Sequence, residues 1–277
     1  DSRHAGTDQL LARHGVAEAV SWEAPDGTTI QGFLCRPTTP GPHPLVVNIH
    51  GGPVWAFRGT WQLFYPWVPL LVSQGYAVLN PNPRGSAGRG QEFAAQVVGD
   101  MGGADTDDFL SGIDALVELG IADPDRIGLT GASYGGFMSS WLVTRDQRFA
   151  AAVPTAPVTD WYSQHFTSNI PFFDRLFLAG DPAEPGDRFH ERSPVMHAAG
   201  VTTPCLNVTG ALDRCTPPGQ AREFHTALIE HGVESVLVTY PEEGHGVRAF
   251  PALIDYCARM LEWFERHMPV HPTEETR

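Results

Sequence analysis

The sequence predicts an α/β fold in which helices cover both faces of a mostly parallel central sheet. Three observations lead to this prediction. Short apolar runs alternate with segments of helical periodicity along most of the 277 residues. Glycine or proline flanks several of these segments, where strands or helices end. Hydrophobic residues make up 42% of the chain and charged residues 18%, which suits one large domain with a sizeable core.

The expected strands are apolar runs bounded by turn residues. The first two flank Pro25-Asp26-Gly27, a turn signal, and should form an antiparallel hairpin. The later runs alternate with helical segments and should pair in parallel, since helices then cover both faces of the sheet. The expected strands lie at residues 20–22, 28–36, 45–49, 76–80, 126–130, 150–154, 204–208 and 235–240.

The expected helices combine helical periodicity with end signals. The helix at 105–119 has acidic residues in its first turn and Gly120 after it, both favourable to a helix. One stretch, 158–199, breaks the alternation and is rich in aromatic residues, proline and aspartate. We expect a helical excursion there, packed mostly into the core, in a position that also suits the wall of a substrate pocket. The expected helices lie at 61–74, 105–119, 134–144, 218–231 and 249–267.

Charge and cysteine usage narrow the partners and the compartment. The formal net charge of −14 should repel nucleic acid and anionic membranes, and no basic stripe offsets it. No apolar stretch is long enough to span a bilayer, and the N-terminus lacks a signal-peptide pattern. The four cysteines form no metal-binding pattern and favour a reducing compartment, so we expect a cytoplasmic protein.

Gly131-Ala132-Ser133-Tyr134-Gly135 matches the G-x-S-x-G pattern of a nucleophile elbow. In such an elbow a serine lies on a tight turn between a strand and a helix, and small neighbours let the backbone fold sharply. The pattern alone is weak, because glycine is common. Here it lies between an expected strand and an expected helix, which is the context that the chemistry requires. The fold class is therefore an α/β-hydrolase fold, with Ser133 as the nucleophile.

A serine nucleophile needs a histidine base, which a carboxylate orients. In this fold the chain order is Ser, then Asp or Glu, then His. His245 lies in a glycine-flanked loop after the strand at 235–240, and Asp213 lies in a loop after the strand at 204–208. Both loops follow the carboxyl ends of strands, where ligands of such sheets bind. We therefore assign His245 as the base and Asp213 as the orienting acid.

An oxyanion needs hydrogen-bond donors. The elbow geometry supplies the backbone N–H of Tyr134 as one donor. We expect the other donor to be the N–H of Gly52 in His50-Gly51-Gly52-Pro53, and the N–H of Gly51 is the less favoured alternative. His50 precedes the nucleophile and should support the loop. Arg84 either binds substrate or braces loops, and the second role carries more weight.

These motifs together resemble the catalytic domain of the prolyl oligopeptidase family of serine peptidases. The resemblance covers residues 20–268. Its HGGP loop is similar to that of the acylaminoacyl-peptidase branch, whereas the prolyl-cleaving branches carry tyrosine in place of His50. The resemblance thus implies a backbone oxyanion donor and argues against strict proline specificity. The motifs are HGGP at 50–53, NPRGS at 82–86, GASYGG at 131–136, Ser193-Pro194, GxxD at 210–213 and EGHG at 243–246.

Family members usually carry an N-terminal β-propeller, and this sequence contains no propeller repeats. The resemblance makes 1–20 a segment that connects to an upstream propeller, 21–270 the catalytic domain and 271–277 a C-terminal tail. The alternatives are a portion of a longer protein and a stand-alone relative. Cys215 stands where the family often has an arginine, so substrate contacts through that arginine are not carried over. Family precedent makes a homo-oligomer reasonable, although the sequence shows no interface.

Three functions are compatible with these residues. The first is a peptidase that cleaves short peptides, of the aminopeptidase or acylaminoacyl-peptidase type, through an acyl-enzyme on Ser133. The second is a carboxylesterase or lipase-like hydrolase with the same triad, because fold and triad do not fix the substrate. The third is a non-catalytic binding module, against which the complete set of motifs argues. Besides Arg84, the candidate substrate contacts are Trp161 and Phe172. No metal or organic cofactor is implied.

Overall fold

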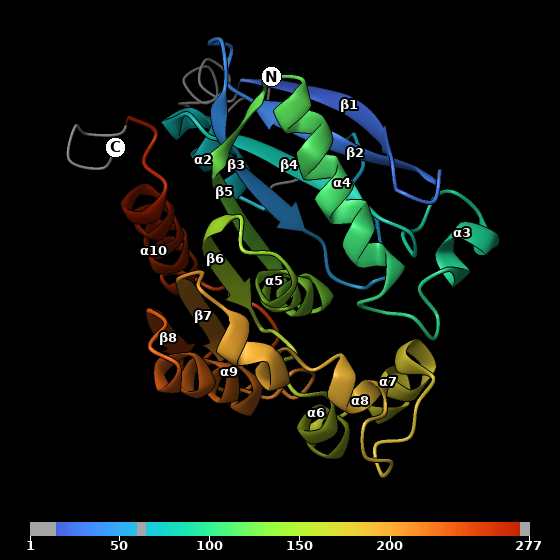
Figure 1. Cartoon of the computed structure of the whole chain (residues 1–277). Helices are drawn as coiled ribbons and strands as arrows, with labels where there is room; N and C mark the ends of the chain where they lie inside the picture. Colours follow the sequence, from blue (N-terminus) through green and yellow to red (C-terminus); the bar gives the residue numbers. More distant parts are fainter. Residues whose placement is uncertain (1–14, 60–64, 272–277) are drawn as a thin grey trace, which may run out of the picture.

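A computed structural model describes residues 15–59 and 65–271 of the chain. These residues form a sheet of eight strands in the order β1-β2-β4-β3-β5-β6-β7-β8 (Figure 1). β1 pairs antiparallel with β2, and β2 pairs antiparallel with β4, while every later pairing is parallel. The expected α/β fold with a mostly parallel sheet is confirmed. The strands are β1 Val16–Glu23, β2 Thr29–Arg36, β3 His43–Ile49, β4 Ala77–Asn82, β5 Ala122–Ala132, β6 Phe149–Thr155, β7 Cys205–Gly210 and β8 Ser235–Tyr240.

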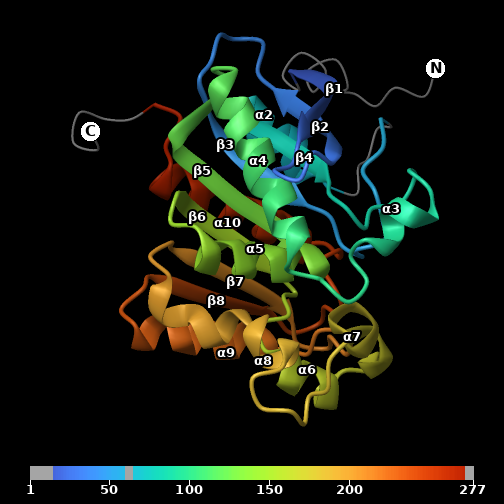
Figure 2. The same ribbon diagram turned by 45° about the vertical axis from the view of Figure 1, so that its right-hand side comes forward.

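Helices cover both faces of the sheet, so the core lies in two layers (Figure 2). On one face α4 (Ala104–Glu118), α5 (Tyr134–Arg145) and α9 (Gly219–Glu230) pack over the strands. On the other face α2 (Trp67–Gln74) and α10 (Ala252–His267) pack together. Every residue of β3 is buried, because both of its faces lie under these layers.

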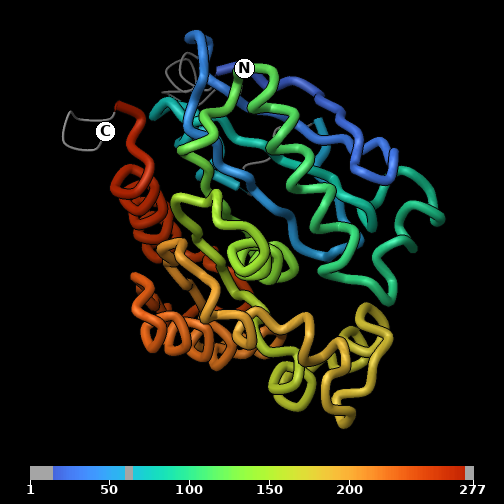
Figure 3. Tube along the Cα trace, viewed as in Figure 1, coloured from blue at the N-terminus to red at the C-terminus, as the bar shows by residue number. Residues whose placement is uncertain are grey.

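The aromatic-rich stretch between β6 and β7 is a helical excursion, as expected. It contains α6 (Trp161–Thr167), α7 (Pro171–Leu178), α8 (Arg188–Glu191) and the 3-10 helix η1 (Pro194–Gly200). In both ribbon views this excursion extends past one end of the sheet, beside the loops that follow β6 and β7 (Figures 1 and 2). The tube along the Cα trace shows the same path (Figure 3).

Several element ends differ from the sequence-based assignment. β1 begins at Val16, so part of the expected connecting segment 1–20 pairs with β2. α2 begins at Trp67, and residues 61–64 of the helix expected at 61–74 lie outside the described residues. Residues 1–14 and 272–277 lie outside them as well. None of the helices in the described part of the chain has the length and apolarity that crossing a bilayer demands.

Candidate active site

The nucleophile elbow is the tight turn that joins β5 to α5. Ser133 lies at φ 63° and ψ −120°, in the positive-φ region that non-glycine residues rarely adopt. Such strain is held only where the surrounding structure imposes it, and it clusters at functional sites. Here Gly135 allows the turn, because a Cβ on this residue would lie 2.1 Å from the carbonyl oxygen of Ile49. The sequence pattern thus has a steric cause.

His245 and Asp213 meet across two loops at the carboxyl ends of β7 and β8. The Nδ1–H of His245 donates to Oδ2 of Asp213 over 2.8 Å. The other carboxylate oxygen of Asp213 accepts the backbone N–H groups of Cys215 at 2.8 Å and Thr216 at 3.0 Å. These two bonds fix the plane of the carboxylate, so that Oδ2 faces the imidazole. The side chain of Asp213 is fully buried, while that of His245 is 34% exposed and can meet a substrate.

His245 and Asp213 each stabilise the charged form of the other. Burial alone would lower the pKa of His245, but the bond to Asp213 and the nearby Cys215 raise it above the ordinary value. Burial alone would raise the pKa of Asp213, but the bond to His245 lowers it below the ordinary value. Asp213 therefore stays ionised, and the imidazolium that forms during proton transfer is stabilised.

The HGGP loop lies directly beside the elbow. A Cβ on Gly51 would lie 3.6 Å from Cβ of Ser133 and 3.3 Å from the carbonyl oxygen of Ala132. Gly52 has a φ of 126°, which only glycine adopts readily. The loop can therefore bring backbone N–H groups close to Ser133. Within the described residues the Ser133 hydroxyl has no hydrogen-bond partner. The bond from a nucleophile to its base is often long in structures without substrate and shortens when substrate binds.

His50 supports the HGGP loop through hydrogen bonds, and its ring is neutral. Burial lowers the pKa of His50 to about 4. Its Nδ1 lies 2.7 Å from the carbonyl oxygen of Gly51, which can only accept, so Nδ1 carries the proton. Its Nε2 then accepts the hydroxyl of Ser86 over 3.0 Å. The loop-supporting role expected for His50 is confirmed.

Tyr134, whose backbone N–H is the expected oxyanion donor, is anchored by its phenol. The hydroxyl donates to Oδ2 of Asp105 over 2.7 Å, and both side chains are buried. Burial raises the pKa of Asp105 to about 6, although the bond to Tyr134 opposes the rise. The acidic first turn of α4 therefore holds the residue that follows the nucleophile. The sequence pattern marks Asp105 only as a helix-start signal and does not predict this contact.

Arg84 makes the contacts of the loop-bracing alternative. Its guanidinium donates to Asp108 at 2.7 to 3.1 Å and to Asp26 at 2.8 and 3.2 Å. Its backbone N–H also donates to Asp108 over 2.7 Å. The Asp108 side chain is fully buried, and that of Arg84 is 9% exposed. The arginine joins the NPRGS loop to α4 and to the β1–β2 turn.

Replacing Arg84 by alanine should lower the free energy of unfolding by about 3–5 kcal/mol, because it leaves the Asp108 carboxylate buried without its cation. Urea denaturation would measure the loss. Arg259→Ala is the matched control, since it breaks an exposed pair with Asp255 and should cost less than about 1 kcal/mol. Equal losses in the two variants would contradict the bracing role.

The two candidate aromatic contacts have different surroundings. Trp161 is 1% exposed and packs edge-on against Phe137 at 5.0 Å, while its Nε1–H donates to the carbonyl oxygen of Arg192. Trp161 begins α6, and its buried ring packs that helix against α5. It is therefore a core residue rather than an accessible substrate contact. Phe172 is 71% exposed on α7, which leaves its ring accessible. Of the two rings, only that of Phe172 is exposed enough for a substrate to reach.

Comparison with known proteins identifies the family of the chain. The model described as the prolyl oligopeptidase family matches residues 61–270. The chain belongs to this family. An uncharacterized peptidase, YuxL, of Bacillus subtilis (strain 168) is 36% identical over 94% of the chain, which covers 41% of that relative. Acylamino-acid-releasing enzyme 1 of Oryza sativa subsp. japonica is 29% identical over 81% of the chain, which covers 30% of the rice protein.

Solved structures of the family agree with the fold. The acylaminoacyl peptidase of Pyrococcus horikoshii superposes with a TM-score of 0.86 at 26% identity, over 97% of this chain and 45% of that one. A puromycin-hydrolyzing peptidase of Mycobacterium tuberculosis gives a TM-score of 0.86 at 25% identity, over 93% of this chain and 40% of that one. The chain thus spans less than half the length of these relatives.

Proposed function

We propose that this chain is the catalytic portion of a serine peptidase of the acylaminoacyl-peptidase or aminopeptidase type. One observation carries the proposal: a strained serine elbow lies beside a glycine-rich loop, and Ala132 of the elbow lines the same cavity as His245, which is hydrogen-bonded to a buried aspartate. Ser133, His245 and Asp213 are the proposed triad. Family membership supports peptide bonds as substrates.

The proposed mechanism follows from the tautomer of His245. Because Nδ1–H donates to Asp213, Nε2 of the neutral ring carries the free lone pair and takes the Ser133 proton during attack. The tetrahedral oxyanion is stabilised by the N–H groups of Tyr134 and Gly52. His245 then returns the proton to the leaving amine, and an acyl-enzyme remains on Ser133. Water then attacks this ester while His245 takes its proton, and His245 returns that proton to the Ser133 oxygen as the acid product leaves.

The substrate class is proposed from the relatives whose names state an activity. They include acylamino-acid-releasing enzymes and a puromycin-hydrolyzing peptidase. Because the relatives are longer than this chain, an upstream β-propeller that selects short peptides is part of the proposal, as is a homo-oligomer. The four cysteines all carry free thiols, which supports a cytoplasmic location.

A substrate panel tests the proposal. The purified protein would be assayed with aminoacyl-anilides, with the same anilides N-acetylated, and with simple acyl esters. We expect hydrolysis of at least one anilide class at kcat/KM values that compete with those of the esters. The ratio of acetylated to free substrates then separates the two peptidase types. Turnover of the esters alone would reject the peptidase in favour of the carboxylesterase alternative.

A further inference from the structure

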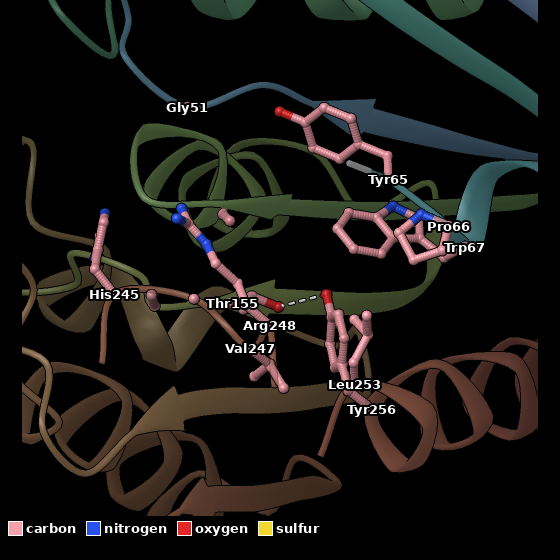
Figure 4. Close-up of a pocket in the computed structure, with 13 residues that line it drawn as sticks. Gly51, Tyr65, Pro66, Trp67, Thr155, His245, Val247, Arg248, Leu253 and Tyr256 are labelled. Atoms are coloured by element: carbon pink, nitrogen blue, oxygen red, sulfur yellow. Dashed lines mark hydrogen bonds between the residues drawn. The ribbon is translucent and has the colours of Figure 1, made fainter. Parts of the chain in front are cut away.

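A cavity of about 290 Å³ opens beside His245 and Gly51 and runs toward α2 and α10 (Figure 4). The mechanism above uses His245 at its rim but assigns nothing to its interior. In Figure 4, Tyr65, Trp67 and Tyr256 lie on the opposite side of the view from His245, and Arg248 lies between. This volume falls just below the usual range of about 300–1,000 Å³ for ligand pockets, so it suits one large side chain.

The far wall of the cavity is aromatic, and the polar atoms of Trp67 and Tyr256 are already hydrogen-bonded. The ring centroids of Tyr65 and Trp67 lie 5.2 Å apart, and those of Trp67 and Tyr256 lie 5.5 Å apart. Nε1–H of Trp67 donates to Asn48 over 3.1 Å, and the hydroxyls of Tyr256 and Thr155 are 2.9 Å apart. The wall therefore offers mainly ring surface to an occupant, and an apolar side chain gains most from it.

The position of the cavity assigns it to one side of the scissile bond. His245 returns its proton to the leaving amine, so the leaving group must lie against the histidine. The cavity is lined by His245 and by the residues that follow it, up to Arg248. Among the described residues, those of the excursion between β6 and β7 contribute nothing to its lining. The excursion is therefore left for the acyl side of the substrate.

Arg248 is part of the cavity wall, and its backbone N–H donates to the Glu243 carboxylate over 3.2 Å. Charges of both signs therefore lie near this part of the cavity. The ring surface of the far wall, and not charge, favours an aromatic or large aliphatic occupant.

We propose that this cavity is a leaving-group subsite that receives an aromatic or large aliphatic side chain of the residue following the scissile bond. The inference rests on the proposed function, since it requires an acyl-enzyme on Ser133. Leu253, on α10, forms part of the cavity wall. The adjacent Ile254 does not line the cavity and is 61% exposed. These neighbours give a matched pair of variants.

Acyl transfer to added amines tests the subsite without a peptide substrate. The acyl-enzyme would be formed from an N-acetyl-alanine ester and divided between water and equal concentrations of phenylalanine, leucine and glycine amides, with the peptide products quantified by mass spectrometry. Burial of the ring predicts that phenylalanine amide is captured about tenfold or more over glycine amide.

Leu253→Trp fills the cavity and should reduce the phenylalanine-to-glycine capture ratio about tenfold, whereas Ile254→Trp should preserve the ratio. The wild-type ratio tests the proposal even if the filled variant does not fold. An acyl-enzyme that captures all amides equally, or a ratio preserved in folded Leu253→Trp, would overturn the subsite alone. Failure to form an acyl-enzyme both from this ester and from the alanine ester with a free amino group would overturn the proposed function, and the subsite with it.

Discussion

Replacing Ser133 by alanine is expected to lower kcat for peptide substrates about 10⁶-fold, the scale seen when a serine hydrolase loses its nucleophile. The residual rate then comes only from binding and from the oxyanion donors. Stability should change little, because alanine at φ 63° is no worse placed than serine. Active-site titration with single-turnover kinetics would measure the loss, and thermal unfolding would check the fold.

Ser140→Ala is the matched control for this variant. Ser140 lies in α5, the helix that follows Ser133, is fully buried, and its hydroxyl has no hydrogen-bond partner among the described residues. Removing an unpaired buried hydroxyl costs little, so this variant should keep wild-type rates. A Ser133→Ala protein with more than about one-thousandth of wild-type kcat would exclude Ser133 as the nucleophile.

Replacing Asp213 by asparagine is expected to lower kcat about 10⁴-fold, because an amide can hold the imidazole in the wrong tautomer. The pH profile should change as well. The His245 base acts when deprotonated, and Asp213 raises its pKa above the ordinary 6.5, so wild-type kcat/KM should rise with pH through an apparent pKa above that value. In Asp213→Asn the apparent pKa should fall. Rate measurements from pH 5 to 10 would follow both changes.

Asp255→Asn is the control for the second prediction. Asp255 is an exposed carboxylate, 45% exposed, that pairs with Arg259 on α10. Its replacement should leave kcat and the pH profile unchanged. An Asp213→Asn enzyme whose acid limb keeps the wild-type apparent pKa would contradict the pairing of Asp213 with His245.

The sequence allowed a correct prediction of the parts of the fold that are locally encoded. β3 is a continuous apolar run because it is buried on both faces, and β8 is bounded by turn residues. The strand ends that carry Ser133, Asp213 and His245 were identified for the same reason. Glycines marked the elbow, since close approach to Ile49 leaves no room for a side chain at Gly135.

Sequence signals are weaker where strand pairing or element length, rather than an apolar pattern, defines an element. β5 begins at Ala122, four residues before the expected start, because its first part is partly exposed and held by a backbone pairing between His43 and Ala122. α3 (Gln91–Ala95) escaped prediction, since five residues are too few to establish a period. Most of β1 is exposed, so Val16 carried little signal.

Long-range contacts account for what was missed at the site. Arg84 meets Asp108 and Asp26, which lie far from it in the chain, and no local pattern specifies such a partnership. Trp161 and Phe172 belong to one aromatic-rich stretch, yet the first is buried and the second exposed, because the docking of each helix decides the difference. The aromatic cavity wall likewise joins residues from α2 and α10.

The most direct test of the proposed triad is to locate the reactive side chain chemically. The protein would be treated with a fluorophosphonate, digested and sequenced by tandem mass spectrometry. We expect one phosphonyl adduct on Ser133, slow labelling of Asp213→Asn and His245→Ala, and none of Ser133→Ala. An adduct on another side chain, or wild-type labelling of Ser133→Ala, would contradict the assignment of Ser133 as the nucleophile.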